Sequence, residues 1–208
     1  MLLTHDLHPA LIHAPLALLP AAALVDVLAT LRRRDRRLDR MGARLWWATA
    51  GAGLGAGLAG MAASQEIDLA DDRARDVMFL HGFGNFTVVL TALGLAAWRS
   101  RNRADLTSAS AGVLAAGAAI YGAYLGGELV YTHGAGVKRP GGRAAANPPL
   151  FSREAPARLA VDALRGLGWL FDRARLAVSG RERVDRTALG PIATAGTGAE
   201  PPAAHQPL

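Results

Sequence analysis

The sequence predicts an all-α integral membrane protein, built as a four-helix bundle that is followed by a C-terminal amphipathic helix and a disordered tail. Hydrophobic residues make up 51% of the 208 residues, and the mean hydropathy is +0.18. They fall into four long blocks with almost no charge, each matching the roughly 20 residues that a helix needs to cross a bilayer. The pattern therefore argues against a soluble globular enzyme.

The four expected spans are residues 7–31, 45–63, 77–98 and 107–132. Pro15 and Pro20 fall within the first block, where membrane helices tolerate proline better than soluble helices do. This block is too long for the core of a signal peptide, and no basic segment precedes it, so we expect a retained helix. Residues 1–137 are thus predicted to form one transmembrane domain.

The basic residues between the blocks predict the orientation, and all of them except Lys138 are arginine. The connections after the first and third blocks carry Arg32, Arg33, Arg34, Arg36, Arg37, Arg40, Arg44, Arg99, Arg101 and Arg103. The positive-inside rule then places both termini outside a bacterial cytoplasmic (inner) membrane. Trp46, Trp47 and Trp98 are expected at the cytoplasmic interface. Positive charge distributed in this way indicates a membrane rather than a nucleic acid partner.

Beyond the bundle, residues 138–154 are predicted to be a linker, 155–180 an amphipathic helix and 181–208 a disordered tail. The apolar stripe of this helix consists of Ala160, Leu164, Leu167, Phe171, Ala174 and Val178. The opposite side carries Arg158, Asp162, Arg165, Asp172 and Arg173. We expect the helix either to lie on the membrane surface or to pack on a partner or on the bundle, and the pattern favours neither.

Small residues in two of the blocks predict close helix packing. The second block contains two GxxxG pairs, Gly51 with Gly55 and Gly53 with Gly57. The fourth block adds Gly112, Gly117, Gly122 and Gly126. Simple close packing is the preferred interpretation, and a slot for a flat cofactor is the alternative. Homo-oligomerisation through these faces is a further expectation.

Histidines gather at one end of the predicted bundle. Five of the six lie there, namely His5, His8 and His13 in the first helix, His81 near the start of the third, and His133 at the end of the fourth. Antiparallel helices have no reason to place histidines at a shared depth. An unpaired imidazole in an apolar helix is costly to bury, and His13 is in such a helix. The shared depth predicts a common polar site, with separate structural roles as the alternative.

Imidazole nitrogen suits haem iron, copper and zinc. Haem b requires two facing imidazoles, which His13 with His81, or His8 with His133, could supply. The four histidines could instead bind one or two metal ions, with Glu66 or Glu128 as a carboxylate ligand or partner. The chain has no cysteine, which excludes thiolate metal sites and covalent haem attachment.

Two further polar residues, Asn85 and Asp26, are predicted to have supporting roles. Asn85 follows His81 by one helical turn. Asp26 lies near the other end of the first helix, where a salt bridge to Arg32 or Arg44 is the preferred role and a proton relay is the alternative.

Three segments, together with Asp26, resemble a known family. Residues 8–15 read HPALIHAP, residues 81–85 read HGFGN and residues 126–134 read GGELVYTHG. They resemble the bacterial membrane family catalogued as domain of unknown function 2231, over about residues 5–137. The resemblance implies four transmembrane helices and a link to respiratory or c-type haem proteins, and it implies no known reaction. The family often has an aromatic residue where this chain has Ala14.

Together these observations predict a non-enzymatic membrane subunit that binds haem b or a metal ion through the histidines on its outer side, with a role in electron transfer. No catalytic residue is assigned. One alternative is a proton- or solute-handling protein whose histidines titrate near neutral pH. Another is a structural subunit that docks a partner through its acidic second connection and basic tail.

Overall fold

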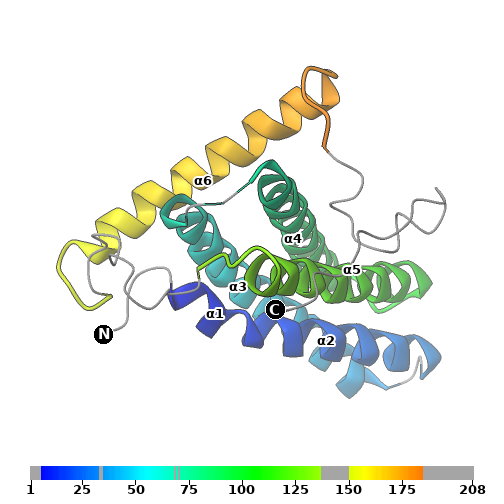
Figure 1. Ribbon diagram of the computed structural model, residues 1–208. Coiled ribbons are helices and arrows are strands. Elements are labelled where there is room, and N and C mark those ends of the chain that lie inside the picture. Colours follow the sequence, from blue (N-terminus) through cyan, green and yellow to red (C-terminus); the bar gives the residue numbers. More distant parts are fainter. Residues whose placement is uncertain (1–5, 33–34, 68, 70, 137–149, 185–208) are drawn as a thin grey trace, which may run out of the picture.

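The computed structural model describes residues 6–32, 35–67, 69, 71–136 and 150–184, which form helices with short connections (Figure 1). The helices are α1 (Leu7–Leu11), α2 (His13–Leu31), α3 (Arg36–Glu66), α4 (Asp72–Arg99), α5 (Leu106–Tyr131) and α6 (Ala155–Val178). The described part of the chain contains no strand. The predicted all-α fold class is therefore confirmed. Most of the predicted linker and tail lies outside the described residues.

Helices α1 and α2 continue one another as a single rod over residues 7–31. Ile12 separates them but keeps helical backbone angles, and its N–H donates to the His8 carbonyl at 3.1 Å. The interruption follows from Pro15, which has no N–H to donate to the carbonyl of Leu11. The first predicted span is thus present with its predicted bounds.

Helices α2, α3, α4 and α5 form a closed four-helix ring. Helix α2 packs on α3 and α5, and so does α4 (Figure 1). The buried core is rich in alanine and consists of Leu19, Ala22, Trp46, Ala50, Val88, Ala92, Leu95, Ala96, Ala115 and Ala119. Small side chains let the helix backbones approach closely, as membrane helices require in the absence of a hydrophobic driving force.

Trp46 is the large exception in this core. Its indole ring fits because Gly112 faces it, and a Cβ atom at position 112 would lie 2.9 Å from the ring. Trp46 is fully buried between the helices, so it contributes to the core rather than to an exposed aromatic belt. Trp47 and Trp98 are both about half exposed.

The direction of the helices shows how the chain crosses the bundle. Arg99 at the end of α4 lies 3.0 Å from Asp26 near the end of α2, so α2 and α4 run parallel. The chain must therefore traverse the whole bundle between them, and α3 makes that crossing. Its 31 residues extend about 46 Å, which is ample for a bilayer.

Composition alone marks three helices of the described chain as long and apolar enough to cross a membrane: Leu7–Leu31, Asp72–Arg99 and Leu106–Tyr131. The remaining predicted span, residues 45–63, lies inside α3. Many of its residues are glycine and alanine, which are less apolar than leucine or valine. Its place in the ring, rather than its hydropathy, is what supports the prediction that it crosses the membrane.

Helix α3 begins at Arg36 rather than near Leu45, because Asp35 caps it. The Asp35 carboxylate accepts hydrogen bonds from the backbone N–H groups of Arg37 and Leu38 at 2.9 and 3.2 Å. Both bonds lower the pKa of the Asp35 carboxyl, and the bond from Leu38 has the larger effect. The cap is therefore charged at neutral pH. Most arginines of the first predicted connection therefore project from the first turns of α3.

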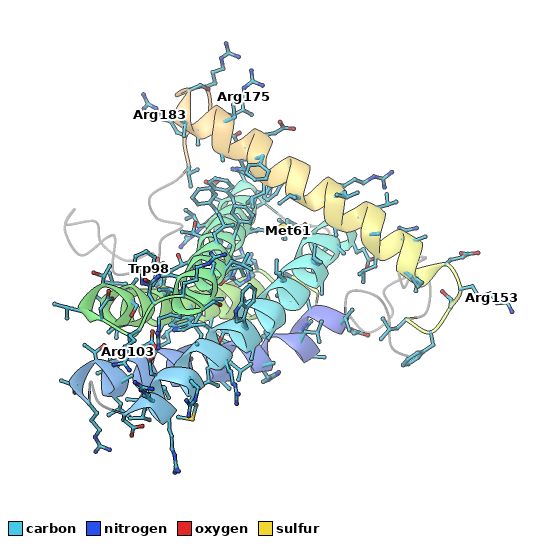
Figure 2. All side chains as sticks on the ribbon, turned by 180° about the vertical axis from the view of Figure 1, so that it is seen from behind. Met61, Trp98, Arg103, Arg153, Arg175 and Arg183 are labelled. Atoms are coloured by element: carbon cyan, nitrogen blue, oxygen red, sulfur yellow. The ribbon has the colours of Figure 1, made fainter. Side chains whose placement is uncertain are left out.

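Helix α6 lies outside the ring and crosses it beside the end of α3 and the start of α4 (Figure 1). Met61 of α3 lies directly beneath it (Figure 2). Of the two expected placements, packing on the bundle is thus observed. The buried residues of α6 are Ala155, Asp162, Ala163, Gly166, Leu170 and Arg173. This face differs from the predicted apolar stripe, because charged residues expected on the outside are buried in ion pairs.

Candidate functional site

The candidate site lies where α1 and α4 begin, an end of the bundle that we call the histidine end. His8 projects from α1 and His81 from α4, and both imidazoles are partly buried. The two ring centroids are 6.3 Å apart and the ring planes are nearly perpendicular, at 88°. Since α2 and α4 are diagonal members of the ring, these two side chains meet across the bundle axis.

Each imidazole is held by a backbone carbonyl of a neighbouring helix. The Nδ1 atom of His8 lies 2.9 Å from the carbonyl oxygen of Ala56 on α3. The Nδ1 atom of His81 lies 2.8 Å from the carbonyl oxygen of Gly122 on α5. A carbonyl only accepts hydrogen bonds, so each Nδ1 carries the proton and donates it. In the neutral imidazole this tautomer leaves a lone pair on each Nε2.

Asn85 lies one helical turn from His81 and contacts its ring. The Asn85 amide nitrogen is 3.4 Å from Nδ1 and 3.2 Å from Nε2 of His81. An atom nearly equidistant from both ring nitrogens lies on the lone-pair axis of neither. The contact therefore orients the ring without using the Nε2 lone pair in a linear hydrogen bond.

Three glycines make room for these side chains. A Cβ atom at Gly60 would lie 2.9 Å from the His8 ring, and one at Gly126 would lie 3.0 Å from the His81 ring. At Gly122 it would lie 2.6 Å from the Asn85 side chain. Each glycine therefore receives a polar side chain from the facing helix. The preferred interpretation of the glycines, close packing, holds at these positions.

The GxxxG pairs of α3 behave differently from one another. Gly53 packs against Val89, and a Cβ atom at position 53 would lie 3.1 Å from the Val89 side chain. A Cβ atom at Gly51, Gly55 or Gly57 would have no neighbouring atom within 4 Å. The two predicted pairs therefore do not act as whole motifs within one chain.

The other two predicted histidine ligands are not brought to this pair. His13 follows His8 by five residues, about 140° around the helix, and is exposed. His133 lies just past the end of α5, where its Nδ1 atom is 3.6 Å from the Asp71 carboxylate at the start of α4. Its Nε2 atom is buried and has no hydrogen-bond partner within the described chain. The pairings of His13 with His81 and of His8 with His133 are thus not observed.

The predicted carboxylate ligands do not complete a metal centre either. Glu66 ends α3 and Glu128 lies in the last turn of α5, and both are partly buried. Across the residues that the structure describes, no group of three or more histidine, aspartate or glutamate side chains is placed to hold a metal ion. The histidine end therefore offers a pair of imidazoles rather than the predicted larger cluster.

A second polar centre, which we call the arginine end, lies at the opposite end of the bundle. The fully buried Asp26 accepts hydrogen bonds from Nε of Arg99 at 3.1 and 3.0 Å and from the Trp46 indole N–H at 2.9 Å. Arg99 also donates to the Asp39 carboxylate at 2.9 Å. The predicted partner of Asp26, Arg32 or Arg44, is therefore wrong. This network ties α2, α3 and α4 together.

Sequence reasoning missed Arg99 and Asp39 because it considered only the connection next to Asp26. A usable signal existed. Asp26 lies near the end of the first block and Arg99 follows the end of the third, so alternating helix directions place them at one depth. The carbonyls of Ala56 and Gly122 had no signal, since any residue type provides a backbone carbonyl.

Comparison with known proteins supplies the family. A family model described as "Predicted membrane protein (DUF2231)" matches residues 4–139. Comparisons with curated proteins and with solved structures give no match. The family match covers α1 to α5 and leaves α6 outside. With three helices apolar and long enough to cross a bilayer, this is a multi-pass membrane protein, and it belongs to the DUF2231 family that its histidine motifs resemble.

Proposed function

We propose that this membrane protein binds a single Cu(I) ion between the Nε2 atoms of His8 and His81, as a non-enzymatic metal-binding subunit. Cu(I) is a d10 ion that accepts two ligands on opposite sides, so a pair of imidazoles suffices for it. Zinc sites in proteins need about four ligands, and the described residues group only two histidines here.

The spacing of the two rings carries this proposal. A ligating imidazole nitrogen lies about 2 Å from its metal ion, so two rings on opposite sides of one ion have centroids roughly 6 Å apart. The observed separation is 6.3 Å. Perpendicular ring planes also keep the ring C–H groups of the two imidazoles apart.

The hydrogen bonds of the pair support the same role. A metal-ligating histidine commonly donates its second ring N–H to a backbone carbonyl or carboxylate, which fixes the tautomer and the ring orientation. Both His8 and His81 have such a bond, to Ala56 and to Gly122. Each Nδ1 proton is therefore already used in a hydrogen bond to a carbonyl, which leaves Nε2 as the ring nitrogen available to an ion.

Haem b fits this arrangement less well. A macrocycle needs a flat slot between its two axial histidines, and glycines were the expected lining of such a slot. The spaces over Gly60, Gly122 and Gly126 are filled by the imidazole rings and the Asn85 side chain themselves. We therefore favour a bare ion over a porphyrin.

A proton pathway through the bundle has less support than the metal site. A pathway needs polar or ionisable groups along its length. Between the histidine end and the arginine end lies the packed core, whose members are alanine, leucine, valine and Trp46. The buried side chains between the two polar centres are thus mostly apolar, and the buried Thr49 hydroxyl donates to the Leu45 carbonyl at 2.8 Å. Partners of the respiratory or c-type haem class stay a prediction.

Metal binding by purified protein tests the proposal. The full chain in mild detergent is titrated with Cu(I), kept reduced, against a colorimetric Cu(I) chelator. We expect one ion per chain for the native protein. The His8→Gln and His81→Gln variants are expected to lose this binding, because the amide can still donate to the carbonyl but is a poor ligand for Cu(I).

Two variants provide the matched controls. His13→Gln and His133→Gln also remove one histidine each, yet both are expected to keep one Cu(I) per chain. Equal loss in all four variants, or stoichiometric binding that persists in both His8→Gln and His81→Gln, would contradict the proposal. Circular dichroism and size-exclusion profiles show whether each variant is folded.

A further inference from the structure

Helix α6 has three distinct faces, separated by roughly 110° to 140° on an ideal helix of 3.6 residues per turn. One face is buried against the bundle, and Asp162, Gly166 and Leu170 mark it. A second face is the apolar stripe of residues 160, 164, 167, 171, 174 and 178. The third face carries exposed charges, among them Arg165 and Asp172. A helix that only packed on the bundle would need two faces, so the apolar stripe requires its own explanation.

The buried face is closely fitted to the bundle. Gly166 lies against the backbone of Met61, where no larger residue would fit, and a Cβ atom at Gly82 would be 3.4 Å from Leu170. Arg173 pairs with Asp76 of α4 and lies over the Phe79 ring, 5.5 Å from its centroid. These contacts fix the rotation of α6 about its axis, and with it the direction of the other two faces.

The depth of α6 follows from the residues that it contacts. Phe86 of α4 contacts Phe171 with ring centroids 5.4 Å apart, and Gly82 contacts Leu170. Both α4 residues lie inside the apolar length of a membrane-crossing helix, after Val77. Helix α6 packs mainly on the last turns of α3 and touches α4 at this level. Its free side therefore faces lipid, because the hydrocarbon layer surrounds the bundle there.

Most of the apolar stripe is exposed in the structure, although Leu167 and Ala174 are partly buried and Phe171 contacts Phe86. Leu164 is 70% exposed, Phe171 50% and Val178 90%. Large apolar side chains gathered along one exposed face indicate a membrane or protein contact. The adjacent polar face has its charges in contact with solvent, and the Arg165 side chain is 69% exposed while it pairs with Asp162.

We infer that α6 is an interfacial helix, docked to the bundle by one face, with its apolar stripe embedded in the lipid at the membrane surface and its charged face in water. Interfacial helices are typically immersed by about 5–10 Å, with arginine side chains toward the headgroups. The match to the family model ends at residue 139, so this lipid contact is an addition beyond the matched region. It is independent of the proposed metal site.

Spin labelling tests this placement directly, because the native chain has no cysteine. Single cysteines are introduced as Leu164→Cys, Arg165→Cys, Phe171→Cys and Asp172→Cys, labelled with a nitroxide, and placed in vesicles of phosphatidylcholine and phosphatidylglycerol. Members of each neighbouring pair lie at nearly the same position along the helix and differ by about 100° in direction. Collision rates with oxygen, which concentrates in lipid, and with a water-soluble nickel chelate are then compared.

We expect the ratio of oxygen to chelate collisions to be several-fold higher at Leu164 than at Arg165, and at Phe171 than at Asp172. Equal ratios within both pairs would overturn the inference, since the stripe would then be in water. Dipolar broadening between labels at Leu164 of two chains would also overturn it, because a second copy would cover the stripe. All four sites are exposed and lie outside the buried face of α6. Phe171→Cys removes the contact with Phe86 and Arg165→Cys removes the pair with Asp162, so the fold of each labelled variant is checked against the native protein by circular dichroism and size-exclusion profile.

Discussion

Asp26 and Arg99 illustrate at the scale of single residues how a buried charge is accommodated. Both side chains are fully buried, and each depends on the other for compensation. Removing one partner from such a pair costs about 3–5 kcal/mol, mostly because the remaining charge is left uncompensated. We therefore expect Arg99→Ala to lower the free energy of unfolding by about that amount, measured by titrating the protein in mild detergent with a denaturing detergent.

The matched controls are the arginines that sequence reasoning assigned to Asp26. Arg32 and Arg44 are exposed, so Arg32→Ala and Arg44→Ala are expected to change stability by less than about 0.5 kcal/mol. If either control lowered the free energy of unfolding as much as Arg99→Ala does, the loss could not be assigned to the ion pair between Asp26 and Arg99.

His8 and His13 show how far residue-level prediction could reach. Their shared depth with His81 could be predicted, because helix rise converts sequence position into depth. The sequence could not predict which of the two histidines faces the bundle, because the direction of each side chain depends on how the first helix is rotated about its axis. Packing against Gly60 turns His8 inward, and the 140° between the two then leaves His13 exposed.

At the scale of the helix, glycine placement determines whether α4 and α5 can pack. A Cβ atom at Gly122 would lie 2.6 Å from the Asn85 side chain, whereas Gly117 on the same helix has nothing within 4 Å. Overpacking a fitted interface typically costs about 1–3 kcal/mol. Gly122→Ala is therefore expected to be less stable than Gly117→Ala by about 1–3 kcal/mol in the same unfolding measurement.

Gly117→Ala is the control for this substitution. Alanine favours a helix over glycine by about 1 kcal/mol, so this variant should be as stable as the native protein or slightly more so. If Gly117→Ala and Gly122→Ala had equal effects, the close contact with Asn85 would not limit packing.

The boundaries of the helices could be predicted where a hydrophobic block adjoins a charged residue, as at the start of α5, which follows Asp105. The start of α3 could not be predicted from hydropathy, because Asp35 caps a first turn that is rich in arginine. The docked face of α6 was also missed. Its buried charges, Asp162 and Arg173, are paired, and pairing lets a charged residue occupy a face that composition marks as exposed.

For the whole molecule, the ring of four helices determines which connections share a side of the membrane. The connection after α4 lies with the start of α3, and the end of α3 lies at the other end of the bundle. The excess of arginine in the first group predicts that it faces the cytoplasm. With Gln65→Cys and Arg101→Cys, an impermeant maleimide should label position 65 in intact cells and position 101 only after lysis.

Labelling of both positions from the same side would contradict the crossing of α3. Labelling of position 101 alone in intact cells would keep the crossing but reverse the predicted orientation. The architecture of the bundle and its orientation are thus tested separately.

The central claim is that two imidazoles from diagonal helices converge on one ion, and X-ray absorption at the copper edge tests it most directly. For the Cu(I)-loaded protein we predict a first shell of two imidazole nitrogens at about 2 Å. His81→Gln should remove this two-imidazole shell, while His13→Gln should leave it unchanged. A shell without imidazole, or one that is the same in His81→Gln and the native protein, would contradict the account.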